Sequence, residues 1–168
     1  MTTFTELEIQ SGIKRAIEEM GYQTPSPIQA QTLPILLSNK TDFIGLAATG
    51  TGKTAAFTIP LLEKINPQEK NVQALILRPT RELSIQVADQ VRILGKYMGV
   101  QALCIYGGAG YGDQLHGLKK GIPVVVGTPG RIIDHIERGT LRLDNIKVVV
   151  LDEADEMISM GFRDDMET

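Results

Sequence analysis

Short apolar runs typical of β-strands recur along the chain and alternate with stretches typical of helices. The strand-like runs cover residues 42–47, 72–78, 100–106, 122–127 and 146–151. Helix-like stretches cover 53–65 and 81–98, and two more, at about 6–20 and 27–37, precede the first run. Such alternation forms βαβ units, in which helices cover both faces of a mostly parallel sheet. The pattern therefore predicts an α/β fold with a helical N-terminal extension.

The size and composition are those of one globular domain. The chain has 168 residues, of which 42% are hydrophobic and 22% are charged, enough to bury a core. No apolar run reaches the ~18 residues of a membrane span, so no membrane contact is expected. The single cysteine, Cys104, lies in an apolar run and fits a reducing compartment, which favours the cytoplasm. His116 and His135 lack ligand spacing, and neither is assigned a role.

A glycine-rich loop follows the first strand-like run. The sequence AATGTGKT occupies residues 47–54, between a strand-like and a helix-like stretch, as a phosphate loop requires. Gly50 and Gly52 allow a tight loop whose backbone N–H groups surround phosphates. Lys53 is predicted to reach the outer phosphates, and the Thr54 hydroxyl to coordinate Mg²⁺. The alternative is an ordinary glycine-containing turn between a strand and a helix.

Two acids end the last strand-like run. The run 146–151 leads directly into Asp152 and Glu153, and ligands of open α/β sheets bind at the carboxyl ends of the strands. Asp152 is predicted to hold Mg²⁺ through water, and Glu153 to activate or orient the attacking water. Acids are also favoured near a helix N-terminus for purely structural reasons. The phosphate loop favours the chemical interpretation, with Lys53, Asp152 and Glu153 as the catalytic set.

Taken together, AATGTGKT and LDEAD resemble two motifs of the DEAD-box RNA helicases, whose phosphate loop also begins with an alanine, here Ala47. The sequence GYQTPSPIQ at 21–29 resembles the Q motif of that family, with Tyr22 where phenylalanine is commoner and Phe4 as the upstream aromatic. Further along, PTREL, GG and TPGR resemble its RNA-contacting motifs. The resemblance covers almost the whole chain and is nearest to bacterial members.

The resemblance implies a RecA-like phosphate-loop domain that uses ATP and Mg²⁺ and binds RNA. Residues 1–168 would form the N-terminal ATP-binding domain, with a Q-motif region at 1–30 and an incomplete core at 41–168. The implied nucleotide-binding residues are Tyr22, Thr24, Gln29, Ala47, Ala48, Thr49, Gly50, Thr51, Gly52, Lys53 and Thr54, and the implied Mg²⁺ residues are Thr54 and Asp152. The implied RNA-binding residues are Pro79, Thr80, Arg81, Gly107, Gly108, Thr128, Pro129, Gly130 and Arg131. Asp155 would couple this domain to a second RecA-like domain.

Gln29 has two interpretations. Its side-chain amide both donates and accepts hydrogen bonds, the pattern needed to recognise adenine N6 and N7. Ser26, Pro27 and Gln29 also form the pattern of a capping box with proline at the first helical position. The motif alone does not decide between them, and the resemblance favours adenine recognition. Tyr22 is expected either to stack on the base or to pack against the protein.

Thr80 and Thr128 each follow an apolar run where a helix should begin, and an arginine, Arg81 or Arg131, comes soon after. A helix N-terminus with an arginine fork suits a phosphate group. Plain N-capping beside a surface arginine is the other interpretation. Several such sites on one sheet edge suit a single-stranded RNA backbone bound without base reading. They would let a chain of net charge −3 hold RNA without a broad basic surface.

The resemblance implies an ATP-dependent RNA helicase that couples hydrolysis to RNA binding and local unwinding. One alternative is an ATP-gated RNA clamp or scaffold with little unwinding, and an unrelated phosphate-loop ATPase is disfavoured by the Q motif and TPGR. In the family, a strand leading into a Ser-Ala-Thr motif lies between the strands that correspond to 42–47 and 146–151. We therefore expect these strands to flank a gap, the chain to be truncated at its C-terminal end, and the fragment alone to be inactive.

Overall fold

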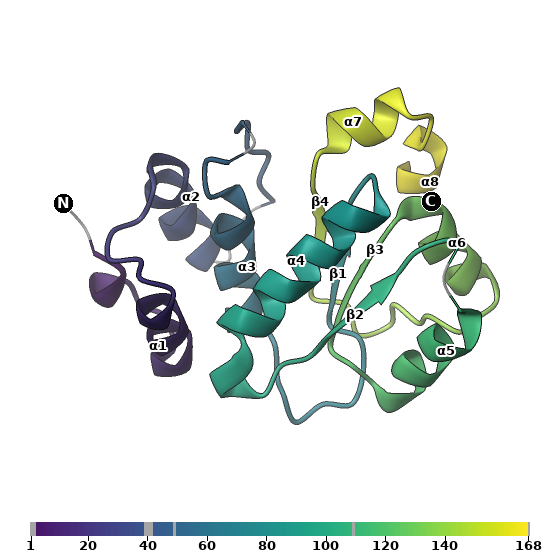
Figure 1. Cartoon of the computed structure of the whole chain (residues 1–168), viewed down its shortest axis with the longest axis horizontal. Coiled ribbons are helices and arrows are strands. Elements are labelled where there is room, and N and C mark those ends of the chain that lie inside the picture. The colour runs from purple at the N-terminus through teal and green to yellow at the C-terminus, as the bar shows by residue number, and fades with distance from the viewer. Residues whose placement is uncertain (1–2, 39–41, 49, 109, 168) are drawn as a thin grey trace.

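The computed structural model describes residues 3–38, 42–48, 50–108 and 110–167. A central sheet is flanked by helices on both sides (Figure 1). The strands are β1 (Ala74–Leu77), β2 (Ala102–Ile105), β3 (Val124–Gly127) and β4 (Val148–Leu151). The α-helices are α1 (Ser11–Glu19), α2 (Pro27–Leu37), α3 (Lys53–Glu63), α4 (Arg81–Leu94), α5 (Tyr111–Lys120), α6 (Pro129–Glu137), α7 (Ala154–Ser159) and α8 (Arg163–Glu167). Short 3-10 helices cover Phe4–Glu6 and Lys96–Met98.

The sheet has the order β2-β3-β1-β4, and every neighbouring pair is parallel. Each of the four strands falls inside a run that the sequence marked as strand-like, and helices α1 and α2 form the expected N-terminal extension. Consecutive parallel strands need a crossover connection, which the helices provide. The predicted α/β class is therefore confirmed.

The two faces of the sheet follow the alternation of side chains along β1. Ala74 and Ile76 point into a core shared with α1, α2, α3 and α4. Leu75 and Leu77 point into a second core, which includes Ile132 of α6 and Met157 of α7. Successive residues of a strand face opposite sides of the sheet. Because a core covers each side, all four side chains of β1 are buried. Both cores fix β1 and hence the residues that follow it.

The prediction of a first strand at 42–47 is wrong. Residues 42–48 form no strand, and the side chains of Ile44 and Leu46 are 92% and 94% exposed. An apolar run becomes a strand only when a neighbouring strand takes its N–H and C=O groups, and no strand within the described ranges lies beside it. The expected gap between two strands is likewise not seen, because β4 is simply an edge strand.

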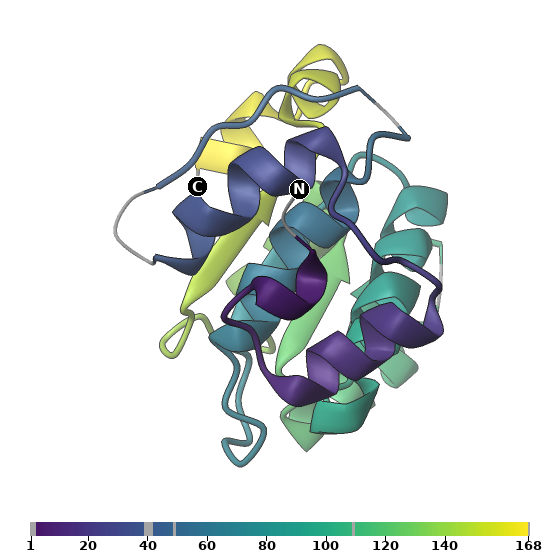
Figure 2. The ribbon, with the colours of Figure 1, turned by 90° about the vertical axis from the view of Figure 1, so that its left-hand side faces the viewer.

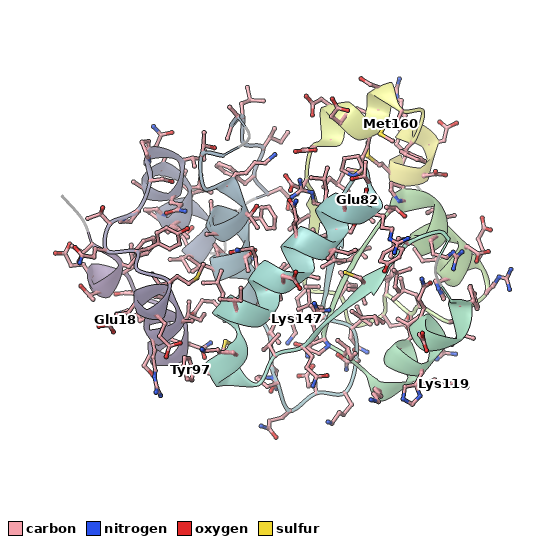
Figure 3. All side chains as sticks on the ribbon, viewed as in Figure 1. Glu18, Glu82, Tyr97, Lys119, Lys147 and Met160 are labelled. Carbon is pink, nitrogen blue, oxygen red and sulfur yellow. The ribbon has the colours of Figure 1, made fainter. Side chains whose placement is uncertain are left out.

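The N-terminal helices pack on the outer side of α3 and α4 (Figure 2). The strands point toward one end of the molecule, where α4 and α7 begin. Glu82 in the first turn of α4 and Met160 after α7 lie at this end, whereas Tyr97 and Lys119 lie at the other (Figure 3). Within the described parts of the chain, no helix has the length and apolar character that crossing a membrane requires.

Candidate functional site

The phosphate-loop sequence forms a turn that leads into α3. Gly50 and Gly52 have φ of 81° and 86°, a left-handed conformation that glycine adopts without steric cost. A Cβ atom added to Gly52 would lie 2.6 Å from Nε2 of Gln29. The backbone carbonyls of Thr51 and Gly52 accept hydrogen bonds from the side chains of Ser26 and Gln29, at 2.9 and 3.0 Å. Glycine at position 52 therefore lets the phosphate loop contact the Q-motif segment.

Gln29 completes a capping box at the start of α2. The Ser26 backbone N–H donates to Oε1 of Gln29 at 3.0 Å, and the Gln29 N–H donates to the Ser26 hydroxyl at 3.4 Å. Pro27 takes the first helical position, as expected. The capping interpretation is thus observed, with both ends of the Gln29 amide bonded within the protein. Adenine recognition stays a prediction, and it would use the second N–H of Nε2 and the second lone pair of Oε1.

A cavity of about 770 Å³ lies between the Q motif, the phosphate loop and α4. It brings together many of the predicted nucleotide residues, which are Tyr22, Thr24, Gln29, Gly50, Thr51, Gly52 and Thr54. Tyr22 is 58% exposed, so its ring has a free surface on which a base can stack. Thr49 lies outside the described residues, and Ala47 and Ala48 precede the turn, where Ala48 accepts a hydrogen bond from the Thr51 hydroxyl at 2.6 Å.

The predicted catalytic residues lie together at the end of β4. The Lys53 ammonium at the start of α3 is 3.2 Å from Oδ1 of Asp152 and 3.5 Å from Oε1 of Glu153. Asp152 is buried, and its backbone N–H continues the ladder to Leu77 at 3.0 Å. A fourth charged residue, Arg78, was not singled out in the sequence, because an arginine beside an apolar run carries no signal of its own. Its guanidinium is 2.7 Å from Oδ2 of Asp152.

Glu153 has an unusual backbone conformation. Its φ is 56°, and no other non-glycine residue within the described ranges has a positive φ. Such a conformation costs of order 1–3 kcal/mol and persists only where the surroundings hold it. Glu153 occupies the N-cap position of α7, so the strained residue sets the turn from strand to helix. The Glu153 carboxylate shares its two cationic partners, Lys53 and Arg78, with Asp152.

The oxygen donors of this site suit Mg²⁺ bound through a nucleotide. No group of three or more His, Cys, Asp or Glu side chains in the described structure is placed to hold a metal by itself. Mg²⁺ commonly binds through one or two carboxylates together with waters and substrate phosphates. The Asp152 carboxylate and the half-buried Thr54 provide hard oxygen donors of this kind.

The predicted RNA-binding motifs lie at the carboxyl ends of β1, β2 and β3. Thr80 caps α4 by accepting a hydrogen bond from the Leu83 N–H at 3.3 Å. Thr128 precedes α6 but makes no side-chain cap, so the capping interpretation holds for Thr80 and not for Thr128. Pro79 and Pro129 are buried, whereas Gly107, Gly108 and Gly130 are exposed. Gly108 has a φ of 82°.

Tyr106 and Gln114 connect these motifs, although no local pattern marked either residue as functional. The Arg81 guanidinium lies 4.7 Å above the Tyr106 ring. The Tyr106 carbonyl accepts a hydrogen bond from Nε2 of Gln114 at 2.9 Å, and Oε1 of Gln114 accepts one from Arg131 at 3.3 Å. The two arginines of PTREL and TPGR are thus joined through one buried amide. Asp155, by contrast, is exposed on α7, away from this network.

His135 of α6 is fully buried behind Arg131. Its Nε2 lies 2.9 Å from Oε1 of Gln114, and its Nδ1 lies 2.8 Å from the Thr140 hydroxyl. The ring stacks on Tyr111 with centroids 4.6 Å apart. Burial, followed by the positive charge of Arg131, lowers the pKa of His135 below its ordinary value. A neutral ring at this place keeps Gln114 oriented toward Arg131.

Comparisons with known proteins agree with these motifs. A family model described as DEAD/DEAH box helicase matches residues 26–168. The DEAD-box ATP-dependent RNA helicase CshA of Bacillus subtilis is 54% identical over 166 residues, which are 99% of this chain and 33% of the relative. The ATP-dependent RNA helicase DeaD of Haemophilus influenzae is 54% identical over 167 residues, 99% of this chain and 27% of the relative.

Among solved structures, a DEAD box protein from the hyperthermophile Methanococcus jannaschii matches with a TM-score of 0.95 and 46% identity. The match covers 99% of this chain and 46% of that chain, and it confirms the RecA-like fold implied by the motifs. The chain spans about a third of the length of the curated relatives it matches. Because the family model matches most of the residues and the relatives match almost all of them, the chain belongs to the DEAD/DEAH box helicase family.

Proposed function

We propose that this chain is the N-terminal ATP-binding domain of an ATP-dependent RNA helicase, which binds ATP with Mg²⁺ and hydrolyses it when RNA is bound. Residues 1–30 would form the Q-motif region and 41–168 a core that the rest of a longer protein completes. The curated relatives are about three times as long as the chain, which supports a further RecA-like domain. Cys104, a free thiol, suits the reducing cytoplasm.

One observation carries the proposal. Lys53 begins α3 and Asp152 directly follows β4, and their charged groups meet at 3.2 Å although the residues are far apart in sequence. A phosphate-loop lysine beside acids at a strand end is the arrangement in which phosphate-loop NTPases hold a nucleotide. A merely structural turn would not require a lysine and two acids to share a half-buried site, because removing charged groups from water is costly even when they are paired.

The roles follow from the positions of the side chains. Lys53 would turn from the acids to the outer phosphates, helped by the free N–H groups at the start of α3. Asp152 and Thr54 would hold the metal, which offsets phosphate charge when bound. Glu153 would accept a proton from the attacking water or orient it. Gln29 and Tyr22 would contact the adenine, and Asp155 would act toward the second domain.

RNA would bind along the edge formed by Thr80, Arg81, Gly108, Thr128 and Arg131. The helix N-termini of α4 and α6 carry partial positive charge, and each has an arginine in its first turn. Phosphate and 2′-hydroxyl contacts of this kind bind RNA without reading its sequence. The cation–π and hydrogen-bond contacts of Arg81 and Arg131 hold the two guanidinium groups in defined places.

The test uses the full-length natural protein and measures ATP hydrolysis with and without single-stranded RNA. We expect RNA to raise the rate, and Lys53→Ala to weaken nucleotide binding by about 10–100-fold, the value of a hydrogen bond to a charged group. Lys119→Ala is the matched control, because Lys119 is an exposed lysine at the far end of the sheet (Figure 3).

An RNA-independent rate, or unchanged ATP affinity in Lys53→Ala, would contradict the proposal. Separation of a short RNA duplex supports a helicase. Long retention of RNA with no strand separation would instead indicate an ATP-gated clamp.

A further inference from the structure

Arg78 is a buried charge directly after β1. Its side chain is only 5% exposed, and its backbone N–H donates to the Gly127 carbonyl at 3.0 Å. A guanidinium stays charged at all physiological pH values, and burying it is costly unless it is paired. None of the roles given above to Lys53, Asp152 and Glu153 requires this second cation, so its place among them needs its own explanation.

The guanidinium contacts the first two acids of the DEAD sequence, Asp152 and Glu153. Nη1 lies 2.7 Å from Oδ2 of Asp152, and Nη2 donates to Oε1 of Glu153 at 3.3 Å. The planar fork of arginine suits such bridging, because two nitrogen atoms hold two oxygens in a fixed relation. Neither Nε of Arg78 nor Oδ2 of Asp152 has a hydrogen-bond partner within the described residues. Arg78 is therefore held to Asp152 by an ion pair and to Glu153 by a hydrogen bond.

Lys53 and Arg78 approach Asp152 through different oxygens. Lys53 faces Oδ1 at 3.2 Å, whereas Arg78 faces Oδ2 at 2.7 Å. The Lys53 side chain is 19% exposed and the Arg78 side chain 5%. The lysine is a flexible point charge, and the arginine is enclosed by the protein. Movement of Lys53 to a phosphate would therefore release Oδ1 while Arg78 still holds Oδ2.

We propose that Arg78 is a positioning residue for the two acids: its fork fixes one oxygen of Asp152 and one of Glu153, so that Asp152 keeps Oδ1 for Mg²⁺ and Glu153 keeps Oε2 for water. The inference rests on the proposed ATP hydrolysis. A purely structural role for Arg78 would leave the effect of Mg²⁺ on nucleotide binding unchanged, whereas a positioning role makes that effect depend on Arg78. The positioning role also differs from a brake, in which Arg78 would occupy the place of the metal.

The experiment compares full-length wild-type protein with Arg78→Met and Arg78→Lys. Arg142→Gln is the charge control, because Arg142 is exposed in the segment between α6 and β4. Affinity for fluorescent ADP is measured with Mg²⁺ and with a chelator, and melting temperature is recorded for every variant. RNA-stimulated hydrolysis then gives kcat, KM for ATP and the Mg²⁺ concentration for half-maximal rate.

We expect Mg²⁺ to strengthen nucleotide binding much less in Arg78→Met than in wild type, while the affinity in chelator changes little. The kcat should fall by about tenfold or more, as when a catalytic group is misplaced, with a smaller change in KM. Arg78→Lys should restore most of the melting temperature but not kcat, because an ammonium group cannot bridge two carboxylates as a fork does.

Three results would overturn the inference. Folded Arg78 variants with a wild-type Mg²⁺ effect and kcat would leave Arg78 without a role toward the acids. Tighter Mg²⁺-dependent binding or faster hydrolysis would make Arg78 a brake. Failure of both variants to fold, Arg78→Lys included, would make it a structural residue. Failure of the proposed function is recognised separately, because the wild-type protein would then show no RNA-stimulated hydrolysis and Lys53→Ala no loss of binding.

Discussion

At the scale of single residues, Glu153 combines a strained backbone conformation with two cationic neighbours. Its φ of 56° would suit glycine better, yet this position carries a carboxylate, for which we propose a role in hydrolysis. The contacts of its Oε1 with Lys53 and Arg78, at 3.5 and 3.3 Å, help to offset the backbone cost. A residue whose backbone conformation destabilises the fold and whose side chain contacts several charged groups is a strong candidate for a functional residue.

Glu153→Gln in the full-length protein should keep ATP and RNA binding but reduce kcat by about 10²–10⁴-fold, the usual contribution of a general base. The side-chain shape is unchanged, whereas the group that accepts the proton is lost. Steady-state hydrolysis and nucleotide affinity check this, with Glu156→Gln as the control on the exposed side of α7. A normal turnover rate would remove Glu153 from the mechanism.

The observed capping role of Gln29 and its proposed role in adenine recognition can be separated by measurement. Its capping box and its bond to Gly52 predict that Gln29→Ala lowers the free energy of unfolding by about 1 kcal/mol. Adenine recognition predicts a second effect, a loss of preference for ATP over GTP. Gln31→Ala is the matched control, because Gln31 is exposed on the same helix. Unchanged ATP/GTP selectivity in Gln29→Ala would leave Gln29 with the capping role only.

At the scale of elements, α6 carries a buried histidine whose ring contacts Gln114, the residue that also accepts a hydrogen bond from Arg131. The charged neighbours of His135 are Arg131, Asp134 and Arg138; burial has the largest effect on its pKa, and the net shift is downward. In the neutral ring, Nε2 donates to Gln114, a role assigned from the hydrogen-bond network. Protonation would place a positive charge next to Arg131.

The sign of the resulting pH dependence follows from linkage. The unfolded chain binds a proton at His135 near pH 6.5, and the folded chain binds it only at lower pH. Stability is therefore fully present above about pH 6.5 and is lost as the pH falls toward the folded pKa.

His135→Gln should remove this part of the acid destabilisation. Denaturant unfolding of wild type and variant between pH 7.5 and about pH 5 measures it, since the loss of stability begins near the unfolded pKa of about 6.5 and continues as the pH falls. His116→Gln, at an exposed position on α5, is the control. An identical pH dependence of stability in wild type and His135→Gln would show that the buried ring contributes none of it.

At the scale of the whole molecule, the β4 side of the sheet differs from its centre. Val149 and Leu151 of β4 are 53% and 42% exposed, whereas every side chain of β1 is buried. The apolar residues Ile44 and Leu46 are exposed as well. Apolar runs of this kind are typical of buried strands in parallel sheets, so this side of the sheet is suited to further strands.

Hydrogen exchange tests that view on the polypeptide of residues 1–168 and on the full-length protein. In the shorter polypeptide, amides of 42–48 should exchange almost as in an unfolded chain, and those of β1 should be protected. In the full-length protein, 42–48 should gain protection, because new strands would supply hydrogen-bond partners. Protected amides at 42–48 in the shorter polypeptide would contradict this prediction.

Much of the molecule was determined by sequence alone, because the relevant signals are local. The apolar runs predicted all four observed strands, the glycines and Lys53 marked the phosphate loop, and the Ser26–Gln29 pattern marked the cap of α2. Each depends on neighbours within a few residues, where backbone geometry and side-chain spacing act directly. The motif residues themselves could be named without any coordinates.

The tertiary structure decided what depends on partners far along the chain. The run 42–47 has the composition of a strand but forms none, because a parallel strand exists only when another strand lies beside it. Arg78, Tyr106 and Gln114 gained their places through contacts with residues remote in sequence. The strained φ of Glu153 likewise follows from packing rather than from its identity. Partners brought together by folding leave no local pattern, so only the three-dimensional arrangement revealed them.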